Sequence, residues 1–292
     1  MTTKSGYIAV IGRPNAGKST FLNWILGEKI KLVSHKANAT RKRSTAIVMH
    51  HDAQMIFIDT PGLHEREKKL NQFMLDEALK AMSDAEMILF LADVRDDLEH
   101  YRHFLSKLDP KIPHLVLLTK IDLISHAKLL SRLQDYALAA PQALEIVPLS
   151  PTKDINKIEI LNAIEKHLPE GPYYYDPELL TTDTVKEIYR ELIREALFNG
   201  LSDEIPYESD VVIQKIEETE RLDRIKATII VNKESQKLVV IGKGGQTIKR
   251  LGTQARRELE NFSGKKIYLE LFVKTMKNWV TDEKSMKEIG YE

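Results

Sequence analysis

Short apolar runs alternate with amphipathic stretches through the first part of the chain. Each run has the length of a buried strand, and each stretch between runs has the helical period of about 3.6 residues. The predicted strands span residues 7–11, 55–58, 87–92, 115–118 and 144–149, and the predicted helices span residues 70–82, 97–108, 127–139 and 156–167. Residues 44–50 and 54–58 flank the polar pair His51-Asp52 and predict a hairpin. The pattern predicts an α/β domain with a mainly parallel sheet, one antiparallel edge strand and helices on both faces.

The alternation stops near His167. Residues 168–177 contain three prolines and a glycine, which cannot continue a helix or a central strand. We therefore predict a first domain over residues 1–168, a linker over 169–178 and a second domain over 179–292. The second domain reads as α+β: the predicted helices span residues 182–198 and 247–259, and the predicted strands span residues 208–218, 224–232, 237–241 and 266–273.

Composition narrows the class of protein. The 292 residues suffice for two domains, each with its own core. Lysine and arginine equal aspartate and glutamate in number, so the net charge gives no sign of a polyanionic partner. Evidence for such a partner must come from a local excess of basic residues. The chain has no cysteine, which excludes disulfides, thiolate zinc sites and cysteine nucleophiles. Its apolar runs are too short for a signal peptide or a membrane span, and we expect a cytoplasmic protein.

A phosphate-binding loop follows the first predicted strand. Gly12 to Ser19 match GxxxxGK[ST] between an apolar run and a helical pattern. The glycines let successive backbone N–H groups point at phosphate oxygens, and the following helix adds the positive end of its dipole. Lys18 is expected to reach the β- and γ-phosphates, and the Ser19 hydroxyl to bind Mg²⁺. The candidate nucleotide contacts here are Asn15, Ala16, Gly17, Lys18, Ser19 and Thr20.

Two further segments are candidates for the γ-phosphate side. Asp59 ends an apolar strand, where a carboxylate can hold Mg²⁺ through water, and Gly62 can offer a backbone N–H to the γ-phosphate. Thr40 lies in a polar segment without periodicity, and we assign its hydroxyl and carbonyl to Mg²⁺ and the γ-phosphate. Ser19, Thr40 and Asp59 are thus the candidate metal ligands, and Lys18, Thr40 and Gly62 the candidate catalytic residues. An ordinary turn at Asp59 and a surface threonine remain the alternatives when each is considered alone.

The segment Thr119-Lys120-Ile121-Asp122 predicts the base specificity. Guanine presents two donors on one edge, and the carboxylate of Asp122 can accept both, whereas adenine presents an acceptor there. Asp122 is therefore expected to select GTP over ATP, while the Lys120 stem covers the base. Ser150 follows the next strand, where a loop N–H can support the base oxygen. Four signals in this order, each at a strand's carboxyl end, predict a P-loop GTPase domain that binds GTP or GDP with Mg²⁺.

The residue after Asp-x-x-Gly is Leu63, which cannot orient the attacking water as a glutamine does in many GTPases. His64 is a candidate for that role, although an exposed histidine of the loop is the simpler reading. The side chain of Asn15 can help bind K⁺ beside the phosphates, or it can merely cap the loop. We therefore expect slow intrinsic hydrolysis and leave both readings of Asn15 open.

The second domain carries a short glycine loop in a basic surrounding. Gly242, Lys243, Gly244 and Gly245 form GxxG, which lets a nucleic-acid backbone approach closely. Residues 233–277 hold eleven basic residues and four acidic ones, a local excess within a neutral chain. We take the loop with Lys249 and Arg250 as the candidate RNA-binding residues, with a merely solvated helix face as the alternative.

With these motifs identified, the chain closely resembles the Era family of bacterial Ras-like GTPases. The resemblance rests on GRPNAGKST (12–20), TRKR (40–43), DTPGLH (59–64), TKID (119–122), LPEGPYYY (168–175), VIGKGG (240–245) and WVTDE (279–283). It implies a type II KH domain that binds the 3′-end region of 16S ribosomal RNA, a role in assembly of the 30S subunit, and peripheral association with the inner membrane. We also expect a monomer. Thr119 departs from the asparagine usual in the family, and Pro151 from its alanine.

Three other functions remain open from the residues alone. The chain can be a tRNA-modifying or metabolic GTPase, although its nine histidines are scattered. It can be a scaffold with structural nucleotide and negligible turnover, which Leu63 permits. It can also be a peripheral-membrane regulatory GTPase whose basic face meets anionic lipid.

Overall fold

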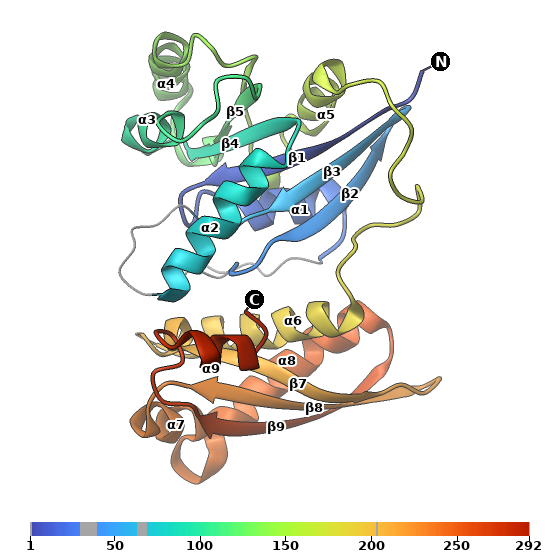
Figure 1. Cartoon of the computed structure of the whole chain (residues 1–292), viewed down its shortest axis with the longest axis vertical. Helices are drawn as coiled ribbons and strands as arrows, with labels where there is room; N and C mark the ends of the chain where they lie inside the picture. The colour runs from blue at the N-terminus through green and yellow to red at the C-terminus, as the bar shows by residue number, and fades with distance from the viewer. Residues whose placement is uncertain (1, 30–39, 63–68, 203, 292) are drawn as a thin grey trace. The chain divides into compact units, whose positions relative to one another are not determined.

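The computed structural model describes residues 2–29, 40–62, 69–202 and 204–291. Its contacts divide the chain into two compact units. Unit 1 is built mainly from residues up to 182, and unit 2 mainly from residues 183 onward (Figure 1). Each unit has its own sheet. Within the described residues, no helix is both long enough and apolar enough to span a membrane.

Unit 1 is organised around a six-stranded sheet in the order β2-β3-β1-β4-β5-β6. Strands β1, β3, β4, β5 and β6 are parallel, and β2 pairs antiparallel with β3 at one edge. The strands are β1 (Lys4–Gly12), β2 (Ser44–His50), β3 (Ala53–Asp59), β4 (Met87–Asp93), β5 (His114–Thr119) and β6 (Ile146–Pro148). The predicted α/β fold, with one antiparallel edge strand, is confirmed.

Helices cover both faces of this sheet because its strands are apolar on both sides (Figure 1). On one face Phe21 of α1 and Ile160 of α5 pack with Val10 of β1. On the other face Met82 of α2, Phe104 of α3 and Tyr136 of α4 complete the core. The helices are α1 (Lys18–Leu26), α2 (Lys69–Ser83), α3 (Glu99–Leu105), α4 (His126–Ala139) and α5 (Lys157–His167).

The carboxyl ends of the parallel strands meet at one edge of the sheet. Asp59 pairs with Val10, two residues before the end of β1, and Asp93 at the end of β4 pairs with Thr119 at the end of β5. Parallel pairing therefore brings together polar residues that are far apart in the sequence.

The segment from Pro169 to Thr182, here called the connector, runs along unit 1. Its first part pairs with the start of β1, where the Ser5 N–H donates to the Pro169 carbonyl at 3.2 Å. Its last part follows the edge strand, where the Ile47 N–H donates to the Leu180 carbonyl at 2.8 Å. The residues predicted as the linker, 169–178, thus have fixed hydrogen-bond partners in unit 1.

The helices and strands of unit 2 follow the order α6-β7-β8-α7-α8-β9-α9 along the chain. Its sheet has the order β7-β8-β9, with β7 antiparallel and β9 parallel to β8. Helix α6 begins with a capping box in which Thr184 and Glu187 bond each other's backbone N–H groups. The elements are α6 (Val185–Gly200), β7 (Ser209–Glu217), β8 (Leu222–Val231), α7 (Glu234–Ile241), α8 (Gln246–Ser263), β9 (Lys266–Thr275) and α9 (Glu283–Glu288).

One predicted element of unit 2 is wrong. Residues 237–241 were expected to be a strand, yet they lie in the helix α7. The Gln236 side-chain oxygen accepts the N–H groups of Asn232 and Lys233, each at 2.9 Å, and so starts the helix. Gln236 and Val240, one helical turn apart, are buried while Leu238 is exposed. The apolar run is therefore half of a helical face.

Candidate functional site

The phosphate loop joins β1 to α1 in a conformation that needs its glycines. A Cβ at Gly12 would lie 2.4 Å from the Leu91 carbonyl oxygen, and Gly17 has φ of 100°. The Ala16 N–H donates to the Arg13 carbonyl at 3.2 Å and closes the turn. The loop therefore fixes its backbone at the N-terminus of α1, where the helix dipole favours an anion.

Lys18 is buried beneath this loop. Its ammonium group donates to the carbonyls of Gly12 at 2.9 Å and Arg13 at 3.1 Å. Burial lowers the pKa of Lys18 to about 8, and the carboxylate of Asp59 partly offsets that effect. A buried ammonium group is stabilised when phosphate oxygens come within reach.

The three predicted metal ligands converge. The Ser19 hydroxyl lies 3.2 Å from the Thr40 hydroxyl and 3.4 Å from Asp59 Oδ2, and the Thr40 hydroxyl lies 3.4 Å from the same oxygen. All the donors are oxygens, and one is a carboxylate that is 1% exposed. Such a donor set fits Mg²⁺. Ser19, Thr40 and Asp59 are the residues that would hold it.

The strand-to-loop turn after Asp59 is held against the phosphate loop. The Thr60 hydroxyl donates to the Val10 carbonyl at 2.7 Å. A Cβ at Gly62 would lie 2.8 Å from three atoms of Pro14, so only glycine lets the two segments approach this closely. Leu63 and His64, which the sequence singled out for the attacking water, lie outside the described residues.

Thr119 ties the base-reading segment to the phosphate loop. Its buried hydroxyl donates to the Ala16 carbonyl at 2.7 Å and lies 3.2 Å from the Ala92 carbonyl. Thr119 thus supplies a direct link between β5 and the phosphate loop.

Lys120 spans the space between the loop and the end of β4. Its ammonium group donates to the Asn15 carbonyl at 2.5 Å and lies 3.0 Å from Asp93 Oδ2. Burial alone raises the pKa of Asp93, but hydrogen bonds from Arg95 and Lys120 outweigh it and hold that pKa well below its usual value. A charged Asp93 anchors the Lys120 stem where a base would lie.

Ser150 positions Asp122 through its side chain. The Ser150 hydroxyl donates to Asp122 Oδ1 at 2.5 Å and lies 3.2 Å from the Thr152 hydroxyl. Ser150 is buried while Asp122 is exposed, so a buried donor orients a carboxylate that faces outward. The sequence analysis had assigned Ser150 a backbone contact with the base and had not foreseen this hydrogen bond.

Two residues of this edge were missed from the sequence. Asp93 had a usable signal, since it follows the apolar run 87–92 as Asp59 follows its own strand. Asp96 binds the guanidinium of Arg13 through two hydrogen bonds and holds the start of the phosphate loop. No sequence motif indicates the pairing of Arg13 with Asp96.

Asn15 adopts the left-handed backbone conformation, with φ of 63°. Asparagine tolerates this region better than most residues, which supports its role in the turn. Its side chain is exposed at the phosphate loop. Both readings of Asn15, a structural one and a cation ligand, therefore remain open.

The glycine loop of unit 2 lies between α7 and α8. A Cβ at Gly242 would lie 2.2 Å from the Thr247 hydroxyl, whereas a Cβ at Gly244 or Gly245 would meet nothing within 4 Å. All three glycines have positive φ, at 74°, 58° and 79°. Gly242 is therefore required for packing, while the other two keep an open backbone surface beside the exposed Lys243.

The two basic residues predicted on α8 differ in their surroundings. Lys249 and Arg250 are both exposed in the first turns of the helix. The guanidinium of Arg250 donates to the Gly200 carbonyl at 2.6 Å and joins α8 to the end of α6. Arg250 thus has a structural partner although it is exposed.

Comparisons with known proteins match both units. Residues 7–120 match a family model described as 50S ribosome-binding GTPase, and residues 204–280 match the KH domain model. GTPase Era of Helicobacter pylori strain P12 is 50% identical over 296 residues, covering 100% of this chain and 98% of the relative. Two solved structures each cover 99% of both chains: an Aquifex aeolicus Era variant bound to GDP·AlF4⁻ (TM-score 0.94, 33% identity) and Era with MgGDPNP and nucleotides 1506–1542 of 16S ribosomal RNA (TM-score 0.92, 36% identity).

Proposed function

The chain belongs to the Era family of GTPases, and on that premise we propose that it is a guanine-nucleotide switch that acts in assembly of the small ribosomal subunit. Unit 1 binds GTP with Mg²⁺ and hydrolyses it to GDP and phosphate. The KH unit binds the 3′-end region of small-subunit ribosomal RNA. The observation that carries the proposal is the convergence of Lys18, Asp59 and Asp122 at one sheet edge in a chain that matches its relatives from end to end.

Guanine selection rests on a carboxylate held in a fixed orientation. Asp122 accepts the Ser150 hydroxyl at 2.5 Å through Oδ1, which restrains the side chain before a nucleotide arrives. The carboxylate then accepts the two donors of the guanine edge, and the Lys120 stem covers the base. Preorientation lowers the entropy lost on binding and adds to specificity.

Hydrolysis depends on positive groups placed where negative charge develops on the phosphates. Lys18 donates to the β- and γ-phosphate oxygens, and the N–H of Gly62, held against Pro14, meets the γ-phosphate. Mg²⁺ held by Ser19, Thr40 and Asp59 would neutralise charge on the same phosphates. Because no glutamine follows Gly62, we propose that intrinsic turnover is slow.

A bound K⁺ is the finer part of the proposal. Asn15 stands at the rim of the phosphate loop, and its carbonyl side chain is a suitable ligand for a monovalent cation. Turnover of the wild-type enzyme should then rise with K⁺ relative to Na⁺ at constant ionic strength. Equal potassium responses of the wild type and the Asn15→Ala variant would reject this role and leave the structural one.

RNA binding is assigned to the glycine loop of the KH unit. Gly244 and Gly245 leave an open backbone surface, Lys243 supplies charge, and the N-terminus of α8 follows directly. The solved relative that carries nucleotides 1506–1542 of 16S ribosomal RNA supports this choice of ligand. Location in the cytoplasm, peripheral membrane contact and a monomeric state stay predictions.

The proposal is tested by two measurements on the full chain. Calorimetry should show binding of GDP and none of ADP, and affinity for an RNA of nucleotides 1506–1542 should differ between GDP and a non-hydrolysable GTP analogue. The Lys243→Asp variant should lose RNA affinity and keep its affinity for GDP, because the two sites lie in different units. Preference for ADP, or RNA affinity independent of the nucleotide, would contradict the switch.

A further inference from the structure

Part of one face of the sheet in unit 2 is exposed, although Thr228 and Ile230 on the same face are buried. The odd-numbered positions of β8 are buried, as Ile225 and Ala227 illustrate, and Ile267 at the start of β9 is buried as well, while α8 packs against β9. The even-numbered positions of both strands point to the other side, because side chains alternate along a strand. Parallel pairing aligns Arg224 with Tyr268, so both side chains share that second face.

Two large aromatic side chains lie open on this face. Tyr268 is 50% exposed and Phe272 is 48% exposed, although neither serves the core. We name the surface formed by Tyr268, Phe272, Arg224 and Lys226 the aromatic face. Exposed rings of this size on a sheet are costly to leave in water and commonly mark a binding surface.

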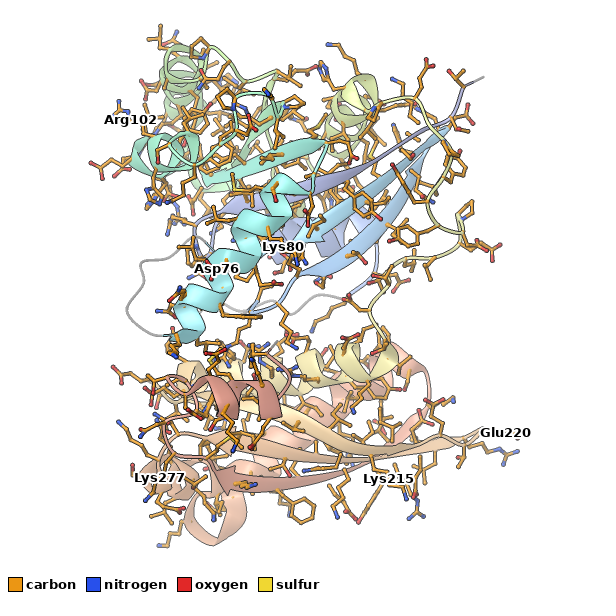
Figure 2. All side chains as sticks on the ribbon, in the orientation of Figure 1. Asp76, Lys80, Arg102, Lys215, Glu220 and Lys277 are labelled. Atoms are coloured by element: carbon orange, nitrogen blue, oxygen red, sulfur yellow. The ribbon has the colours of Figure 1, made fainter. Side chains whose placement is uncertain are left out.

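Each ring carries a cation. The Arg224 guanidinium lies 5.7 Å from the centroid of the Tyr268 ring, and the Lys226 ammonium lies 5.1 Å from the centroid of the Phe272 ring. Lys215 of β7 pairs with Lys226 in register and adds a third positive charge beside them. Figure 2 shows Lys215 among the side chains that extend from this sheet.

The two acidic residues of the face offset part of this charge, and its three cations leave a net positive charge. Glu217 is bound to Lys215 by an ion pair, and Glu270 stands between the two rings on β9. A carboxylate in that position can accept a hydrogen bond from the amino group of a base. Rings for stacking, cations for phosphate and one acceptor between them match a nucleic-acid strand better than a lipid surface or an apolar protein segment.

The spacing of the rings restricts the form of the strand. Tyr268 and Phe272 are four residues apart on an extended strand, which places them about 13 Å from each other. Stacked bases follow each other at about 3.4 Å along one strand of a duplex. Two neighbouring bases of a duplex therefore cannot reach both rings, and the ligand must be unstacked.

We propose that the aromatic face is a second RNA-binding surface, which holds an unstacked single strand by stacking two of its bases on Tyr268 and Phe272. The glycine loop joins α7 to α8 in the layer that packs on the opposite side of the sheet. The two surfaces therefore engage different parts of one RNA and raise its affinity together. This inference rests on the proposed function.

The test uses the full chain bound to GDP and an RNA of nucleotides 1506–1542 of 16S ribosomal RNA. The double variant Tyr268→Leu, Phe272→Leu keeps apolar bulk and removes both ring faces. Its RNA affinity should fall about tenfold or more, since stacking on an aromatic ring contributes about 1–3 kcal/mol per base. Tyr268→Phe is the matched control and should bind like the wild type. Ultraviolet crosslinking should join the RNA to the β9 peptide.

Lys243→Asp separates this inference from the proposed function. If the wild type binds the RNA, Lys243→Asp weakens binding and the double leucine variant binds normally, the aromatic face is overturned and the proposed function stands. If the wild type does not bind the RNA at all, both fail. A double variant that changes sedimentation of the protein, and not its RNA affinity, would identify the face as a protein interface. Unchanged circular dichroism and GDP affinity verify that the variants fold.

Discussion

At the scale of single residues, the sequence predicted those residues of the nucleotide site that directly follow a strand. Lys18, Asp59 and Asp122 could be assigned because each motif follows an apolar run, and parallel strands end at the same edge. The hydrogen bond from Ser150 to Asp122 could not be foreseen, since a hydroxyl's partner depends on neighbours in three dimensions. Asp96 was missed for the same reason.

His114 makes the stability of unit 1 sensitive to acid. The imidazole is 1% exposed at the start of β5, and its Nε2 lies 2.8 Å from the Tyr101 hydroxyl. Burial lowers the pKa of His114. Burial also raises the pKa of Tyr101 to about 12, so the Tyr101 hydroxyl stays protonated and can donate a hydrogen bond to the imidazole. Below pH 6.5, which is about the pKa of a histidine in the unfolded chain, His114 binds a proton in the unfolded state but not in the folded state.

The free energy of unfolding should therefore decrease as the pH falls below about 6.5, with a slope that approaches 1.4 kcal/mol per pH unit from this one group. Urea unfolding at several pH values measures the slope for the wild type and for His114→Gln. The variant should be less stable at neutral pH, because it loses packing, and its slope should be shallower. Identical slopes would show that His114 protonates equally in both states.

At the scale of elements, the first sheet could be read from the sequence, but the start of α7 could not. Strands β3 and β4 are buried along their whole length, so continuous apolar runs identified them. The run Leu238 to Ile241 is also apolar and contains three β-branched residues, and a short run of that kind does not distinguish strand from helix. The outcome was decided by Gln236, whose role requires Glu208 from another part of the fold.

Gln236 should accordingly be the residue that holds α7 in place. Its amide accepts two backbone N–H groups and donates to Glu208 Oε2 at 2.8 Å, in a buried setting. Gln236→Ala removes the acceptor of two backbone N–H groups, while Glu208 keeps its hydrogen bond from the Asn232 amide. The change should cost about 1–3 kcal/mol of the stability of unit 2. The exposed Gln246 provides the control, since Gln246→Ala should change little.

Trp279 gives a local measurement of that effect. It is buried in unit 2 and donates its indole N–H to the Glu208 carbonyl at 2.9 Å. The chain has two tryptophans, so a Trp24→Phe background leaves Trp279 as the sole indole signal. Urea unfolding followed by its fluorescence should show a lower midpoint for Gln236→Ala. An unchanged midpoint would mean that α7 is held by its apolar contacts alone.

At the scale of the whole molecule, the connector is a segment through which unit 1 can influence the KH unit. Gln54 of β3 binds it with three hydrogen bonds: its side-chain oxygen accepts the N–H groups of Tyr174 and Tyr175 at 2.8 and 3.0 Å, and its amide donates to the Tyr175 carbonyl at 2.8 Å. The edge strand β2 binds the last part of the connector, where Thr181 donates to the Thr45 carbonyl at 2.7 Å. Thr45 is five residues beyond Thr40, the candidate γ-phosphate ligand.

When the γ-phosphate is lost, a change at Thr40 can therefore reach the connector through a short length of chain. We expect the connector to transmit that change only while Gln54 holds it in place. Gln54→Ala removes three hydrogen bonds from a fully buried position. The contacts of Tyr7 with Tyr174 and Tyr175 remain, so the change should loosen this part of the connector and raise its accessibility to protease. RNA affinity should then become more similar in the GDP and GTP-analogue states, while GDP affinity stays that of the wild type. Gln142→Ala, at an exposed turn of unit 1, is the matched control. If protease shows the connector loosened and the ratio of the two RNA affinities is nevertheless unchanged, the signal reaches the KH unit by another route.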